Sequence, residues 1–286
     1  MMIKVDEQLV ENSKAKLLNT DEFVGIQTGF NNLDALSEGF ANGQLIIMGA
    51  RPAMGKTTFA CSLLDNVCIN GGKNCIFFTS DMSVQQTVER MIRLHGNVKL
   101  FEDFEEKGED FADRIIESTA ALGKANLWVD DTSVGGGDEF IEKCRQIGKD
   151  ERIDLIIIDH LQLFESDMRD LNGLLMSLKQ LAMEVSCPVL VLSQLNRSVE
   201  KRNDHMPRIS DLPNSKIVEA CADEILFLYR MAYYDYKANK NAASINIAKH
   251  TKFQRLTAHI YYDPEIPAFR TDRLFWGRKE GDTENE

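Results

Sequence analysis

The sequence predicts an α/β fold in which a mostly parallel, twisted sheet carries helices on both faces and ends in a C-terminal β-hairpin. Three observations support this prediction. From residue 45 onward, short apolar runs alternate with longer segments of helical periodicity. The first run is continuously apolar, as a strand buried on both faces requires. The last two runs lie close together in the sequence, and we expect them to pair as a hairpin.

The predicted elements follow one another in a regular order. The strands are expected at residues 45–50, 74–80, 125–131, 155–160, 188–194, 224–230, 243–250 and 258–263. The helices are expected at residues 56–67, 84–94, 138–148 and 171–185. In the last helix, Leu174, Leu178 and Leu181 share one face. Because helices link most successive strands, the crossovers should be right-handed and these strands parallel.

The predicted domain covers residues 21–274, which show no internal repeat and no linker. Residues 1–20 form an N-terminal arm, within which 5–18 has the pattern of a short polar helix. Residues 275–286 form an acidic tail that we expect to be disordered, because its last ten residues contain no apolar side chain.

Composition restricts the class of protein. No apolar run approaches the ~20 residues that span a bilayer, and the N-terminus lacks a secretory signal. The six cysteines form no C-x-x-C pair, so we expect buried, reduced thiols in a cytoplasmic protein. The net charge of −12 predicts that nucleic acid is contacted only through local basic groups. The acidic stretch 102–113 is expected to be a solvated helix face or a loop.

A phosphate-binding loop joins the first predicted strand to the first helix. Its sequence, A-R-P-A-M-G-K-T, matches G-x-x-x-x-G-K-[ST] except that Ala50 takes the first position and Gly49 precedes it. Backbone N–H groups of such a loop converge on phosphates at a helix N-terminus, and Lys56 is expected to reach the β and γ phosphates. The residues predicted to bind nucleotide here are Ala50, Arg51, Pro52, Ala53, Met54, Gly55, Lys56, Thr57 and Thr58.

A second component of a nucleoside-triphosphate site follows at the end of the run LIIID. Asp159 ends this buried strand, where P-loop enzymes place a carboxylate that helps to hold Mg²⁺. The Thr57 hydroxyl is the other expected ligand. The sequence therefore predicts ATP and Mg²⁺ as cofactors.

Several segments together resemble the DnaB-type replicative helicases. They are the loop ARPAMGKTTF, GIQTGFNNLDALSEGF, LIIIDHLQLF, PVLVLSQLNRSVEKR, RISDL and ADEILFLYR, in the family's order. The resemblance implies a RecA-like ATPase core that assembles into a hexameric ring, with ATP between subunits and single-stranded DNA in the centre. The family's primase-contacting N-terminal domain has no counterpart in this sequence. Residues 5–18 match only the linker helix that docks on a neighbouring subunit.

The resemblance also implies roles for residues outside the loop. Asp81 matches the catalytic glutamate that orients the attacking water, although aspartate is shorter by one methylene. Gln194 matches the residue that senses the γ-phosphate. Arg230 and Tyr262 match residues that flank the adenine, where a base can stack between a guanidinium and a ring.

Other positions depart from the family's pattern at the subunit interface and the DNA loops. Lys249 matches one residue of a Lys-x-Arg pair that reaches the neighbouring subunit's ATP, but Thr251 occupies the position of the arginine finger. Lys252 or Arg255 is expected to substitute. In the loop 210–216, Pro213 replaces an arginine. The residues left to contact DNA are Asn214, Ser215 and Lys216, together with Arg169 in the other channel loop.

Three functions are compatible with this pattern. The first is an ATP-driven helicase motor that translocates on single-stranded DNA as a homo-oligomeric ring. The second is a regulatory paralogue that binds ATP, hydrolyses it slowly and joins or blocks a true helicase ring. The third is a recombination ATPase of the RecA/RadA kind, which the loop sequence and SQLNR disfavour. A helicase loader or another replicative helicase is the further partner expected, and no membrane.

Overall fold

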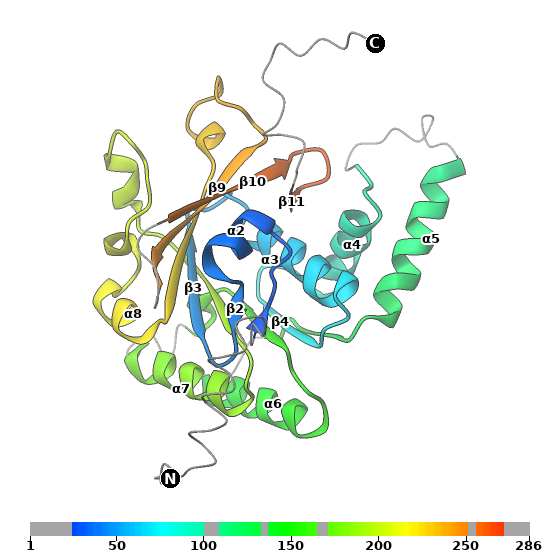
Figure 1. Cartoon of the computed structure of the whole chain (residues 1–286), viewed down its shortest axis with the longest axis horizontal. Coiled ribbons are helices and arrows are strands. Elements are labelled where there is room, and N and C mark those ends of the chain that lie inside the picture. Colours follow the sequence, from blue (N-terminus) through cyan, green and yellow to red (C-terminus); the bar gives the residue numbers. More distant parts are fainter. Residues whose placement is uncertain (1–24, 100–108, 133–136, 165–170, 251–255, 272–286) are drawn as a thin grey trace, which may run out of the picture.

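A nine-stranded sheet runs through the computed structural model, which describes residues 25–99, 109–132, 137–164, 171–250 and 256–271 (Figure 1). The strand order is β11-β10-β9-β8-β3-β7-β6-β4-β5. The strands are β3 (Leu45–Ala50), β4 (Cys75–Thr79), β5 (Leu127–Asp130), β6 (Leu155–Asp159), β7 (Val189–Gln194), β8 (Glu224–Tyr229), β9 (Ala242–Lys249), β10 (Leu256–Asp263) and β11 (Ala268–Arg270). A separate two-stranded sheet pairs β1 (Gly25–Ile26) with β2 (Phe40–Ala41).

The pairing confirms the predicted fold class. The six strands from β8 to β5 are mutually parallel, whereas β9, β10 and β11 each pair antiparallel with the preceding strand. The predicted C-terminal hairpin is the β9–β10 pair. Three-residue β11 was not predicted, because a strand so short leaves no periodicity to detect.

Helices cover both faces of the sheet (Figure 1). They are α2 (Asn31–Ser37), α3 (Lys56–Leu64), α4 (Val84–His95), α5 (Glu109–Lys124), α6 (Gly137–Asp150), α7 (Leu171–Glu184) and α8 (Ser215–Cys221). In β3, Ile46 and Met48 pack in the cluster that contains residues of α3, while Leu45 and Ile47 pack in the cluster that contains residues of α7. The continuous apolar runs therefore reflect strands buried on both sides.

The helices differ from the prediction in three places. The helix expected at 56–67 is α-helical to Leu64 and continues as a π-helix over Asp65–Asn70. The acidic stretch expected at 102–113 enters α5, whose buried side includes Ser118 and is therefore only partly apolar. The short helix α8 begins inside the segment that was predicted to be a DNA-binding loop.

The six cysteines are free; five are buried, and Cys221 is partly exposed. Within the described ranges, no helix combines the length and the apolar character needed to cross a membrane. The predicted arm at 1–20 and the tail at 275–286 lie outside the residues that the structure describes.

Candidate nucleotide-binding site

The phosphate-binding loop connects β3 to α3 and depends on a glycine. Gly55 precedes α3 with φ of 102°, in the region that side chains disfavour. A Cβ at this position would lie 3.0 Å from the Phe269 ring. Ala53 also has positive φ, at 60°. The loop therefore holds a left-handed backbone that opens directly onto the N-terminus of α3, where N–H groups are free to bind an anion.

Lys56 is the first residue of α3, and its ammonium lies among acidic groups. Its Nζ donates to the Ala50 carbonyl at 3.4 Å. Burial lowers the pKa of Lys56, and the nearby Asp159 and Asp81 carboxylates act in the opposite direction. Among the described residues, this long contact is the only hydrogen bond that the ammonium makes, so its other donors can turn to a phosphate.

Asp159 ends β6 and is completely buried. Neither carboxylate oxygen has a hydrogen-bond partner of good geometry among the described residues. Burial raises the pKa of Asp159, while the Thr57 hydroxyl, His160 and Lys56 lower it. Orphaned buried carboxylate oxygens beside a hydroxyl form a donor set that suits a hard divalent cation such as Mg²⁺.

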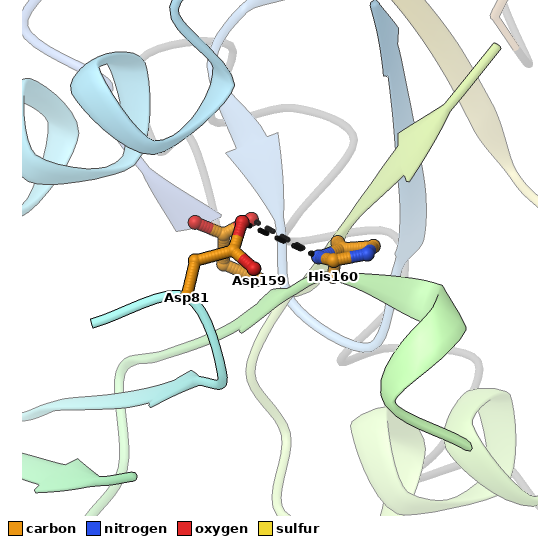
Figure 2. Close-up of side chains that lie close together, drawn as sticks. All are labelled: Asp81, Asp159 and His160. Carbon is orange, nitrogen blue, oxygen red and sulfur yellow. Dashed lines mark ion pairs between the residues drawn. The ribbon is translucent and has the colours of Figure 1, made fainter. Parts of the chain in front are cut away.

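Asp81 and His160 lie next to Asp159, as Figure 2 shows. The His160 Nδ1 is 3.7 Å from Asp81 Oδ2 and 4.0 Å from Asp159 Oδ1. Ligand atoms of the three residues lie within 4.8 Å of one another. Asp81 follows β4, and its side chain is 55% exposed, so it faces the space in front of the buried Asp159.

Gln194 ends β7 beside the loop. It is the register partner of Ala50, which is the last residue of the neighbouring strand β3. Its side chain is exposed. The parallel strands β3, β6 and β7 thus bring the loop, Asp159 and Gln194 to one edge of the sheet, as ligand sites of open α/β sheets require.

Arg230 and Tyr262 come from neighbouring parts of the C-terminal segment. The Arg230 guanidinium lies 3.5 Å from the centre of the Tyr262 ring. Tyr262 in turn packs on Phe269, the residue that crowds Gly55. The pair therefore lies close to the loop, but the two groups stack on each other rather than leaving a gap. A base would have to separate them or stack on an outer face.

Comparison with known proteins agrees with this geometry. The sequence model of the DnaB-like helicase C terminal domain matches residues 25–271. The chain belongs to this family. It is 37% identical over 238 residues to the replicative DNA helicase DnaB of Geobacillus stearothermophilus and 35% identical over 238 residues to the replicative DNA helicase DnaC of Bacillus subtilis. Each match covers 80% of this chain and 52% of the relative, so the chain spans about half the length of these relatives.

Solved structures show the same DnaB-like fold. One of them, an isolated ATPase domain, matches with a TM-score of 0.85 and 28% identity, over 95% of this chain and 99% of that one. A DnaB-like replicative helicase, from a structure that also concerns its interactions with primase, matches with a TM-score of 0.83 and 27% identity, over 94% of this chain and 67% of that one. The predicted RecA-like, ATP-binding P-loop fold is confirmed.

Arg51 occupies a different environment in this DnaB-like domain from the one expected of a phosphate ligand. Its guanidinium donates to Glu200 Oε1 at 2.5 and 3.0 Å and to the Leu195 carbonyl at 2.6 Å. The side chain is therefore engaged with the segment after β7. Arg51 is available to a nucleotide only through its backbone.

The DnaB-like residues predicted for the subunit interface and for DNA are only partly described. Arg169, Thr251, Lys252 and Arg255 lie outside the described residues. Lys249 donates to the Glu219 and Ala222 carbonyls, at 2.5 and 2.6 Å, near the C-terminus of α8 in its own chain.

The segment 210–216 is less of a loop than the sequence predicted. Asn214 precedes α8 with φ of 48°, and Ser215 and Lys216 form the first turn of that helix. Asp211 anchors the start of the segment, because Arg202 donates to its two oxygens at 2.8 and 2.6 Å. DNA-facing groups here would be carried by a helix N-terminus.

Sequence reasoning missed two features of the site. Nothing in the sequence marks His160 beyond its place after Asp159, although its ring lies close to two carboxylates. The partner of Arg51 was not foreseen, because Glu200 is 149 positions away in the sequence.

Proposed function

We propose that the chain is the motor domain of a replicative-type DNA helicase, which hydrolyses ATP in a homohexameric ring and translocates on single-stranded DNA. The observation that carries this proposal is the convergence of Lys56, Asp159 and Asp81 at the loop. Membership in the DnaB-like family supports it. We assign the motor to residues 21–274, the ring-linking arm to 1–20 and a disordered tail to 275–286.

The residues have distinct tasks in the proposed hydrolysis. The loop N–H groups and Lys56 bind the phosphates, and Gln194 contacts the γ-phosphate. Asp81 orients the attacking water. Thr57 and Asp159 would hold Mg²⁺, which when bound neutralises charge on the phosphates. Arg230 and Tyr262 hold the adenine by stacking.

We assign the remaining contacts to other subunits and to DNA. Lys249 and Lys252, with Arg255 as a substitute, serve the neighbouring subunit's ATP. DNA is contacted by Asn214, Ser215, Lys216 and Arg169. A loader or another replicative helicase is the further partner proposed, in the cytoplasm. The DnaB-like relative solved with regard to primase makes primase a second candidate, through a chain or segment beyond this domain.

The test is steady-state ATP hydrolysis with and without single-stranded DNA, with Lys56→Ala as the control. The motor predicts turnover that DNA stimulates and that the variant loses. Tight ATP binding with turnover no higher than that of Lys56→Ala would reject it.

The alternative is an ATP-binding paralogue that regulates a true helicase ring. One observation favours it: Lys249 is bonded within its own chain, and Thr251 stands at the finger position. This alternative predicts slow hydrolysis even with DNA, together with binding to a separate replicative helicase in a pull-down of the purified proteins.

A further inference from the structure

His160 carries a buried nitrogen that the described part of the fold leaves unused. Its side chain is 18% exposed, and Nδ1 is buried with no hydrogen-bond partner among the described residues. The acidic oxygens near it are Asp81 Oδ2 at 3.7 Å and Asp159 Oδ1 at 4.0 Å (Figure 2). A buried donor without an acceptor is unfavourable, and such groups in native proteins call for an explanation.

The geometry points to His160 as a positioning residue for Asp81 in ATP hydrolysis: its Nδ1–H holds the Asp81 carboxylate, either directly or through one water. This inference rests on the proposed function. Both distances exceed a hydrogen bond, but a gap of this size admits a bridging water or closes when a side chain rotates slightly.

Of the two carboxylates, Asp81 is the one that can move. Asp159 is fully buried at the end of a central strand. Asp81 is 55% exposed and follows an edge-ward strand, so its rotamer is less constrained. Closure onto His160 is therefore a movement of Asp81. Lys56 is influenced by the charge of Asp81, which places the carboxylate between the phosphate-binding ammonium and His160.

The chemistry explains why Asp81 would need such a partner. Aspartate is one methylene shorter than the glutamate that the family uses here, and a mobile short carboxylate positions water poorly. A loss of about 1 Å in placement can reduce the rate by ~100-fold. A donor held rigidly next to Asp159 fixes Asp81 at one oxygen and leaves the other oxygen to accept from the water.

The experiment measures kcat and KM for ATP, with DNA present, in His160→Ala, His160→Asn and His160→Gln. The Asn amide nitrogen falls near the position of Nδ1, whereas the Gln amide reaches toward Nε2. We expect His160→Ala and His160→Gln to lower kcat about 10-fold or more with little change in KM, and His160→Asn to recover much of the loss. His95→Ala is the matched control, since His95 pairs with Asp65 at 2.7 Å on another helix pair.

A double-mutant cycle tests whether His160 acts through Asp81. In an Asp81→Asn background, His160→Ala should cause no further loss. An undiminished loss in that background, a loss confined to KM, or no rescue by His160→Asn would overturn the inference.

A second measurement separates this inference from the proposed function. ADP with aluminium fluoride mimics phosphate during attack, and its affinity is compared with that of ADP alone. If wild type turns over no faster than Lys56→Ala, the motor proposal fails, and this ratio then decides the role of His160. A wild-type preference for the fluoride complex that His160→Ala loses and His160→Asn keeps supports positioning; equal ratios in all variants reject it.

Discussion

Two buried carboxyl groups with unpartnered oxygens lie at different ends of the same sheet. Asp159, at the carboxyl end of β6, has Lys56 and Thr57 beside it, so its burial is explained by a ligand site. Glu224, at the amino end of β8 opposite Ile46, has no hydrogen-bond partner among the described residues, and Asp223 adds only repulsion. At the residue scale, the same physical feature indicates function in one place and a cost in stability in the other.

Glu224→Gln should stabilise the protein increasingly as pH rises. Burial raises the pKa of Glu224 from 4.5 to about 8, so between these values the folded state keeps a proton that the unfolded state releases. The wild type therefore loses stability as pH rises, at about 1.4 kcal/mol per pH unit. Urea unfolding of both proteins at pH 5 and pH 7 checks this. Parallel stability curves would contradict the assigned protonation.

Gly55→Ala should abolish ATP binding and destabilise the fold. The residue combines positive φ with a Cβ position 3.0 Å from Phe269. Gly72→Ala is the matched control, since Gly72 has φ of 61° but open space around it. The control should lose only the ~1–2 kcal/mol of left-handed strain and keep its affinity for a fluorescent ATP analogue. Equal ATP affinities in the two variants would show that the loop tolerates a side chain.

At the element scale, the short helix η4 (Arg197–Lys201) is tied to two functional segments. Glu200 holds Arg51 of the phosphate-binding loop. Ser198 donates to Asp211, which begins the segment leading to α8. Asp211 is 1% exposed, and burial alone would raise its pKa. Hydrogen bonds from Arg202, the Arg208 N–H and Ser198 outweigh burial and hold the pKa below its ordinary value.

Asp211→Ala should destabilise the domain by about 3 kcal/mol, because it leaves the Arg202 charge and the Ser198 hydroxyl without their acceptor. Asp204→Ala is the control, since Asp204 also neighbours Arg202 but is 46% exposed and should matter little. The lowered pKa of Asp211 means that its contribution is present near neutral pH and is lost as pH falls through the acidic range. Thermal unfolding of the three proteins at pH 7 and pH 4 checks both statements; equal effects of the two substitutions would contradict the assigned burial.

The sequence was informative where one element carries its own signal. Strands buried on both faces show as apolar runs, so all eight predicted strands are present within a few residues of their expected bounds. Helix α5 was missed although its less exposed positions have helical spacing, because Ser118 interrupts the apolar face. The P-loop could be read from one contiguous motif. The His160–Asp81 proximity and the Arg51–Glu200 pair could not, because only the folded sheet brings strand ends together.

At the scale of the whole molecule, charge and assembly are linked. The net charge of −12 opposes binding of DNA to the surface as a whole. The proposed contacts offer one cation at the N-terminus of α8, Lys216, and one more in Arg169 outside the described residues. A single copy therefore presents too few cations for tight binding. A closed ring would repeat each of them around one channel.

DNA affinity should therefore depend on assembly. Fluorescence anisotropy with labelled single-stranded DNA should show weak binding at protein concentrations where sedimentation finds monomers, and tighter binding once a slowly hydrolysed ATP analogue drives ring formation. In the ring, Lys216→Ala removes one phosphate contact per engaged subunit, so it should weaken binding and make the slope of log affinity against log salt shallower by ~0.7 for each lost contact with a single strand. Lys237→Ala, an exposed lysine after β8, should leave that slope unchanged. Tight, salt-dependent binding by the monomer would instead locate the DNA site on one chain and remove the reason for a channel.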